Sequence, residues 1–217
     1  MRELNLSENV SLNWLGHASF LINYEDKKIY IDPFQLKTFD KADIIFITHH
    51  HYDHYSISDL KKIIKDDTLL VVPEDCTDKI KENNISIAQE NIIMVNVGFS
   101  GEIKGIGVKA VPSYNIDKKF HEKSSEWVGY ILNFNGMKIY HAGDTDVIPE
   151  MKDINCDVAL LPVGGTYTMD AKEAAKACDL INPKKFAVPM HYNSIVGTRE
   201  AAEEFEKLSS CKVEILD

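Results

Sequence analysis

Short apolar segments separated by polar breaks fill the first part of the chain. Segments 11–16, 19–24 and 28–32 are rich in β-branched and aromatic residues, with polar residues between them. This pattern predicts three consecutive strands of an antiparallel meander. Segment 42–48 differs, because residues 44–47 are all Ile or Phe. An unbroken apolar run of this kind is typical of a strand that is buried on both faces, with helices outside.

The remaining pattern predicts alternating helices and strands. Helices are expected at about 56–65, 75–82, 170–181 and 199–208, where apolar residues recur at helical spacing. Strands are expected at 68–73, 92–97, 106–112, 127–134, 137–143, 157–163, 185–190 and 212–216, and Asn135-Gly136 is a strong hairpin signal. Because no linker or repeat interrupts this order, we expect one domain over residues 1–217, an α/β sandwich with sheets inside and helices outside.

Composition narrows the class of protein. The 217 residues are 44% hydrophobic and carry a formal charge of −10, which disfavours binding to a nucleic-acid backbone. No apolar run approaches the roughly 20 residues of a membrane span, and the polar start MRELNLSENV predicts that a signal peptide is absent. The four cysteines lack metal-site spacing, and a chain of this size needs no disulfide. We therefore expect a protein of the reducing cytoplasm.

Half of the eight histidines lie in one short segment, THHHYDHY at 48–55. In an extended chain, His49 and His51 point the same way and can bind one ion together. Asp53 and His54 follow a turn and can face a second ion. Such ligands suit zinc, and also iron or manganese. A solvated His-rich loop is the rival interpretation, which the fixed position of Asp53 and the preceding core strand disfavour.

Two more candidate ligands stand at predicted strand ends. Asp144, in YHAGDTD, follows strand 137–143, and its carboxylate has two oxygens that can bridge two cations. Its alternative role is to cap a short helical turn near 147–150. His191, in VPMHYN, follows strand 185–190. A lone histidine at a strand end is more often structural, but its position at the same sheet edge favours a ligand.

The motifs HHHYDH, HAGDTD and VPMHYN, in this order, resemble the metal-binding motifs of the metallo-β-lactamase superfamily. WLGHASFLI (14–22) and IDPF (31–34) resemble its branch of zinc-dependent hydrolases related to ascorbate-phosphate lactonase and to the phospholipase D that cleaves N-acyl-phosphatidylethanolamine. The resemblance covers about residues 10–193. It implies a four-layer αββα sandwich with a two-metal site at one edge. It also implies a set of ligands: His49 and His51 for the first ion, Asp53, His54 and His191 for the second, and Asp144 between the two.

One position departs from this family pattern. The first metal of the family usually takes a third histidine, often three residues beyond a proline, and three residues after Pro112 this chain has Asn115. Asparagine is a poor zinc ligand. His121 is the alternative, as a metal ligand, a substrate contact or an ordinary loop residue. If neither residue serves, one ion alone is expected. His17 is expected near the metals, hydrogen-bonded to a ligand, or else buried for structural reasons.

These features predict a metal-dependent hydrolase with one or two Zn²⁺ ions, or Mn²⁺ or Fe²⁺. A bound cation lowers the pKa of water towards about 7 and so supplies hydroxide, and Asp53 can orient the attacking water. The expected substrate is a small ester, lactone or phosphodiester. It is anionic if the basic patch of Lys118, Lys119, His121 and Lys123 steers it, although a solvated loop is the favoured explanation of that patch. The alternatives are a binding protein without turnover and a diiron oxidoreductase. No sequence feature identifies an oligomeric interface.

Overall fold

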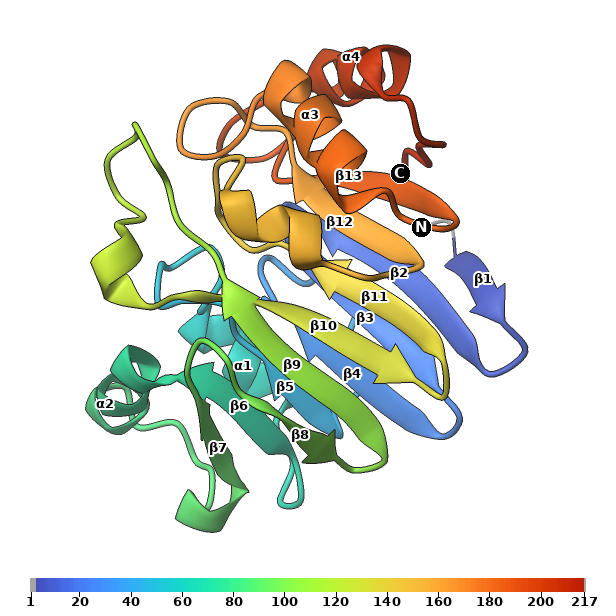
Figure 1. Cartoon of the computed structure of the whole chain (residues 1–217). Coiled ribbons are helices and arrows are strands. Elements are labelled where there is room, and N and C mark those ends of the chain that lie inside the picture. The colour runs from blue at the N-terminus through green and yellow to red at the C-terminus, as the bar shows by residue number, and fades with distance from the viewer. Residues whose placement is uncertain (1–2, 217) are drawn as a thin grey trace. The chain divides into compact units, whose positions relative to one another are not determined.

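The computed structural model describes residues 3–216. Contacts within the chain divide it into two compact units, Met1–Asn96 and Val97–Asp217, each with its own sheet. Figure 1 shows the first unit in blue to green and the second from green to red. Two sheets with helices make this a mixed α/β fold, as the sequence predicts.

The first unit contains a seven-stranded sheet whose strands lie in chain order. The first four strands are antiparallel neighbours, and the last four are parallel. The strands are β1 (Glu3–Ser7), β2 (Val10–Gly16), β3 (Ser19–Tyr24), β4 (Lys27–Ile31), β5 (Ile44–Phe46), β6 (Leu69–Pro73) and β7 (Ile92–Val95). The predicted meander is therefore confirmed, and the apolar run at 44–47 begins the parallel part.

Helices α1 (Ile57–Ile63) and α2 (Glu74–Glu82) pack on this sheet, and the short η1 (Gln89–Asn91) precedes β7. The apolar side of α1, with Leu60 and Ile63, belongs to one buried cluster with Ile45 of β5 and Leu70 of β6. Residues of the parallel strands are buried because the helices that connect these strands lie over a face of the sheet. This core fixes the point at which β5 ends and the histidine loop begins.

The second unit contains a six-stranded sheet in the order β13-β12-β11-β10-β9-β8. Strands β8 to β11 are antiparallel neighbours, whereas β11, β12 and β13 run parallel. The strands are β8 (Ser100–Ile103), β9 (Ile106–Pro112), β10 (Val128–Phe134), β11 (Met137–His141), β12 (Val158–Pro162) and β13 (Phe186–Met190). The carboxyl ends of β11 and β13 lead to Asp144 and His191.

The helices of the second unit are α3 (Ala171–Ile181) and α4 (Arg199–Leu208), with the short η2 (Lys123–Ser125) and η3 (Pro149–Asp153). A capping box starts α3, since the Asp170 side chain accepts from Glu173 N and the Glu173 side chain accepts from Asp170 N. Figure 1 shows α3 and α4 beside β12 and β13. Within residues 3–216, no helix is long and apolar enough to cross a bilayer.

Several expectations need correction. The polar strands β1 and β8 were not predicted, and the strand expected at 42–48 is only three residues long. The strand expected at 212–216 is reduced to one bridge between Ala187 and Val213. Cys178 and Cys211 form a disulfide, contrary to the expectation of free thiols. It joins α3 to the segment after α4, and sequence spacing could not show that these two residues meet.

Candidate metal centre

The histidine loop of the first unit follows β5 at the carboxyl end of a parallel strand, a common place for active sites. His49 Nε2 and His51 Nδ1 lie 3.1 Å apart. Two nitrogens that bind one zinc ion tetrahedrally at about 2.0–2.1 Å are separated by about 3.3 Å. The two rings are therefore placed as a pair of ligands for a single cation would be.

Asp32 fixes the histidine loop through hydrogen bonds to its side chain. It lies at the end of β4 with a left-handed backbone (φ 45°) and is fully buried. Its carboxylate accepts hydrogen bonds from Thr48 N (2.8 Å), Thr48 Oγ1 (2.6 Å) and His54 Nδ1 (2.7 Å). Because the His54 proton lies on Nδ1, the lone pair of Nε2 is left for a cation, the usual arrangement around metal-binding histidines.

Thr48 fixes the neighbouring ring in the same way. Its hydroxyl donates to Asp32, so the Thr48 oxygen accepts from His49 Nδ1 at 2.9 Å. The lone pair of His49 then lies on Nε2, the atom that faces His51. Asp32 and Thr48 thus set the tautomers of two candidate ligands. The role of Thr48 could not be read from the sequence, because it depends on the contact that folding makes with Asp32.

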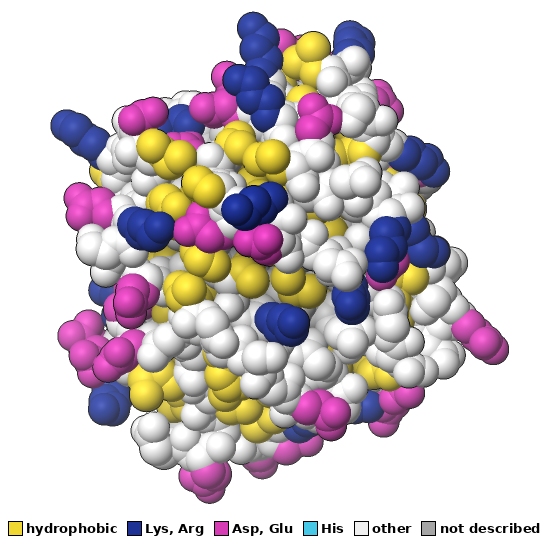
Figure 2. Space-filling view, viewed as in Figure 1, with side chains coloured by type: hydrophobic (Ala, Val, Ile, Leu, Met, Phe, Trp, Pro, Cys, Tyr) yellow, Lys and Arg dark blue, Asp and Glu magenta, His cyan; other side chains and the backbone are white. Residues whose placement is uncertain are grey.

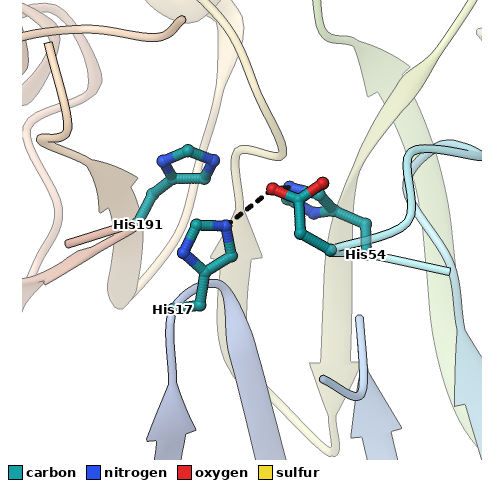
Figure 3. A group of neighbouring side chains, drawn as sticks. His17, His54 and His191 are labelled. Carbon is teal, nitrogen blue, oxygen red and sulfur yellow. Dashed lines mark hydrogen bonds and ion pairs between the residues drawn. The ribbon is translucent and has the colours of Figure 1, made fainter. Parts of the chain in front are cut away.

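His17 is buried and donates from Nε2 to Asp53 Oδ2 at 2.9 Å, the dashed line in Figure 3. Its backbone is left-handed (φ 51°), and its carbonyl accepts from Trp14 Nε1. The ring of Phe34 lies 5.6 Å from that of His17. His17 therefore orients the Asp53 carboxylate.

His50 and Tyr52 point elsewhere. His50 Nδ1 donates at 2.6 Å to Oδ2 of Asp75, which lies on helix α2. The Tyr52 side chain lies against Phe34 (6.1 Å between ring centres) and is 67% exposed. The alternation within the loop thus separates His49 and His51 from their neighbours, in agreement with the expected extended geometry.

In the second unit, two candidate histidines converge on the carboxylate of Asp144. His121 Nε2 lies 3.2 Å from Asp144 Oδ2, and His191 Nε2 lies 3.1 Å from the same oxygen. All three residues are buried. Asp144 is not a helix cap, because η3 starts later, at Pro149, after Ile148. These separations again match those between ligands of a common cation.

His191 is held in an uncommon backbone conformation, with φ of 58°. Gly164, after β12, lies against it: a Cβ atom there would be 2.6 Å from His191 O and 3.0 Å from His191 Nδ1. Only glycine permits this approach. The Gly165 N–H donates to Met169 O at 3.0 Å, so its donor is used within the tight turn itself.

Asn115 lies beside His121 and braces the loop between β9 and β10. Its backbone N–H donates to His121 O (2.7 Å), and its side-chain Nδ2 donates to Tyr167 O (2.7 Å) and to His121 Nδ1 (3.2 Å). The ring of His121 also stacks edge-on against Trp127. The fold therefore brings His121, six residues further along the chain, to Asp144, while Asn115 positions it.

The expected basic patch is largely neutralised. Lys118 pairs with Asp146 and, at 3.0 Å, with Glu173, and Lys123 pairs with Glu150 at 3.0 Å. Burial disfavours the charge of Lys118, but the two carboxylates outweigh it and raise its pKa. Of the three lysines, only Lys119 has no ion pair within residues 3–216.

Imidazole and carboxylate groups are the donor set that zinc, manganese and iron accept, so the residues present fit a divalent cation. The fit is visible inside each unit. In the first, Asp32 and Thr48 leave the Nε2 atoms of His54 and His49 for a ligand role. In the second, two imidazoles face one oxygen of Asp144.

Comparison with known proteins agrees with this chemistry. The β-lactamase superfamily domain matches residues 11–191. A UPF0173 metal-dependent hydrolase of Thermococcus onnurineus is 38% identical over 221 residues and covers 95% of each chain. A crystal structure from Parabacteroides distasonis, whose proposed function is metal-dependent hydrolysis, gives a TM-score of 0.82 at 32% identity, covering 96% of this chain and 94% of the other. Igni18, a metallo hydrolase of Ignicoccus hospitalis, gives 0.75 at 27%, covering 96% and 95%.

Proposed function

The chain belongs to the metallo-β-lactamase superfamily, and from this membership we propose that residues 1–217 act as one catalytic domain that hydrolyses a small neutral ester or lactone. It is a metal-dependent hydrolase, the activity by which relatives of 35–38% identity over most of the chain are named. The observation that carries the proposal is the pair of facing nitrogens of His49 and His51, with tautomers preset by buried groups.

The proposed ligands follow the family pattern. His49 and His51 hold a first ion, with His121 in place of the usual third histidine. Asp53, His54 and His191 hold a second ion, and Asp144 is shared. The 3.1 Å separation of the His49 and His51 nitrogens and the contact of His121 with Asp144 support the first group, and the contact of His191 with Asp144 supports the second. Zinc suits this set, and manganese or iron is the alternative.

When bound, a divalent cation lowers the pKa of water towards about 7 and polarises the substrate oxygen. The chain supplies orientation. Asp53 accepts a proton from the attacking water or positions it, while His17 holds the Asp53 carboxylate in place at 2.9 Å. Asp32 keeps the proton of His54 on Nδ1. No serine or cysteine nucleophile is needed.

The surroundings favour a neutral substrate with a flat apolar part. The Phe34–Tyr52 pair flanks the histidine loop, and the Phe120–Tyr167 pair (5.4 Å between ring centres) flanks the His121 loop. Tyr52 and Phe120 are 67% and 59% exposed, and such aromatic rings near polar groups are typical of ligand contacts. An anionic phosphodiester is the weaker candidate, because carboxylates compensate Lys118 and Lys123.

The test is a metal analysis of untagged protein combined with hydrolysis of an aryl ester, a γ-lactone and bis-(p-nitrophenyl) phosphate. We expect bound metal, ester or lactone turnover, complete loss of activity on chelation and recovery when Zn²⁺ or Mn²⁺ is returned. His51→Ala and Asp144→Ala should abolish activity, whereas the adjacent His50→Ala should keep most of it, because His50 turns towards Asp75.

The other outcomes separate the rivals. Activity that survives full metal removal would overturn the proposal. Metal content below one ion per chain without turnover would favour a binding protein. Two irons with visible absorption and no hydrolysis would favour a diiron oxidoreductase. Faster turnover of the phosphodiester than of the ester would reverse the preference for a neutral substrate.

A further inference from the structure

A groove of about 560 Å³ lies in the second unit, between its sheet and η3. This volume is in the range of small-molecule sites, roughly 300–1,000 Å³. None of the proposed metal ligands lines it. Its apolar lining comes from β9, β10 and β11 on one side and from η3 and its flanking residues on the other: Val111, Ile131, Tyr140, Ile148, Met151 and Ile154.

Strand register explains why these side chains share one face. Lys109 of β9 lies opposite Ile131 of β10, and Ile131 lies opposite Tyr140 of β11. Asn133 lies opposite Lys138 in the next row of the same face, because side chains alternate along a strand. In Figure 1, β9, β10 and η3 lie at the front of the second unit, and Figure 2 shows hydrophobic side chains between isolated lysines and acids on that side.

The charges at the rim are unbalanced. Within residues 3–216, neither Lys109 nor Lys138 forms an ion pair. Of the two acids in the lining, Glu150 accepts from the Tyr114 hydroxyl at 2.9 Å and from Lys123 at 3.0 Å, so the charge of Glu150 is compensated. Asp153 alone remains as an uncompensated acid. The rim therefore offers two free cations against one free anion.

A buried hydroxyl adds a polar group to the apolar lining. Tyr140 is fully buried, and within the described residues its Oη has no hydrogen-bond partner. Leaving such a group unpaired costs about 1–3 kcal/mol, and buried polar groups without a partner are uncommon. Burial also raises the pKa of Tyr140, so the hydroxyl stays protonated and can donate to an incoming acceptor.

We propose that this groove is a second ligand site, which binds a small amphipathic anion such as a medium-chain aliphatic carboxylate. The aliphatic part lies against Ile131, Met151 and Ile154. The carboxylate accepts from the Tyr140 hydroxyl and faces the ammonium groups of Lys109 and Lys138. The groove thus combines apolar contact area with a donor and an excess of positive charge, the recognition chemistry that this class of ligand requires.

The test is calorimetric titration of the metal-loaded protein with octanoate, octan-1-ol and octylammonium. We expect saturable binding of octanoate, weaker binding of the alcohol and none of the ammonium. Lys109→Glu with Lys138→Glu should weaken octanoate binding about tenfold or more. The control Lys172→Glu with Lys176→Glu makes the same change of net charge on the exposed side of α3 and should leave binding unchanged.

Two further variants locate the ligand. Tyr140→Phe removes a hydroxyl without a partner, so it should fold normally and weaken octanoate binding about three- to tenfold. His51→Ala should leave octanoate binding intact, which distinguishes this site from the proposed metal centre. The inference is overturned if octanoate does not saturate, if both lysine pairs have equal effects, or if His51→Ala removes binding. It is also overturned if the groove is covered by a second copy, shown by a dimer that Lys109→Glu with Lys138→Glu dissociates.

Discussion

At the scale of single residues, Asp32 holds the histidine loop of the first unit in place through its carboxylate. It accepts three hydrogen bonds, two from Thr48 and one from His54. A buried carboxylate that accepts three hydrogen bonds is held firmly in one position. The low dielectric of the core makes each hydrogen bond stronger and makes an unpaired polar group costly. Asp32 touches neither the proposed ions nor the substrate, so it is a positioning residue.

Asp32→Asn keeps the shape of the side chain but replaces one acceptor by a donor. His54 Nδ1–H then loses a charged partner, and we expect metal affinity to fall about 10- to 100-fold. Metal content at a buffered free zinc concentration measures this loss, and excess zinc should restore activity. Asp26→Asn, at an exposed hairpin position, is the control and should bind zinc as the wild type does. Equal metal affinity in both variants would refute the role of Asp32.

Gly164 acts by the absence of a side chain. Gly164→Ala would place a methyl group 2.6 Å from His191 O and 3.0 Å from His191 Nδ1. Because backbone cannot yield easily there, we expect His191 to shift, and a displacement of about 1 Å can lower kcat about 100-fold. Gly101→Ala, whose new atom would meet only the Phe99 ring at 3.1 Å, is the control. Unchanged kcat in a folded Gly164→Ala protein would contradict this expectation.

At the scale of elements, the loop between β9 and β10 is fixed by polar contacts rather than by apolar packing. Lys118 ties it to Asp146 and Glu173, and Asn115 ties it to Tyr167. Ile116 and Phe120 in the same loop are 56% and 59% exposed. A loop with few apolar contacts opens at a lower free energy than the sheet, so these polar contacts decide how well His121 is placed.

Lys118→Met should lower the free energy of unfolding by about 1–2 kcal/mol, since charged hydrogen bonds are lost at a partly exposed site. The pKa of Lys118 is raised in the folded protein. Its contribution is therefore complete below the unfolded pKa of about 10.4 and is lost as the pH rises through the higher folded value. Urea titrations at pH 8 measure the loss of unfolding free energy in the variant, and titrations at pH 11 measure how far the Lys118 contribution has disappeared. Lys119→Met, next to it and unpaired, should change stability little at either pH.

Strands and helices with strong apolar patterns were predictable from sequence, whereas the weak ones were not. The four long helices were placed to within a few residues. β1 (ELNLS) and β8 (SGEI) were missed because their residues have little strand preference and form strands only through pairing with β2 and β9. Segment 42–48 was predicted too long, since the Thr48 N–H already donates to the Asp32 side chain rather than to a strand.

The candidate site was predictable where chemistry is local. The motif around His49 and the strand ends before Asp144 and His191 are visible in the sequence. Contacts made by folding are not, which is why Thr48 was missed and why His121 was left open beside Asn115. Lys118 and Lys123 were grouped as a basic patch because sequence shows neighbours along the chain and not the carboxylates that fold against them.

At the scale of the whole molecule, the Cys178–Cys211 disulfide closes the end of the described chain. It links residues 33 positions apart, and beyond it Tyr192 donates to Leu216 O at 3.2 Å. The other two cysteines, Cys76 and Cys156, are free and buried. A reducing compartment keeps most thiols free and an oxidising one lets disulfides persist, so the redox state of the surroundings decides whether this bond is closed.

Reduction should therefore change stability measurably. In the chain-entropy model, a loop of this length stabilises the folded state by about 3–4 kcal/mol. We expect dithiothreitol to lower the urea midpoint of the wild type. Cys178→Ser with Cys211→Ser should show the lower midpoint from the start and no further response to reductant. A wild-type curve that reductant leaves unchanged would show that the two thiols are not joined.

His17 and His191 share a backbone conformation that allows the role of each side chain to be tested directly. Both have positive φ, 51° and 58°, and both are about 1% exposed. Glycine adopts this conformation without strain, so His17→Gly and His191→Gly should keep the chain path and leave a hollow with the outline of the lost ring. Imidazole added to the solution should enter that hollow and restore part of the hydrolytic rate. The fraction of the hydrolytic rate that is recovered measures how well free imidazole replaces the histidine side chain.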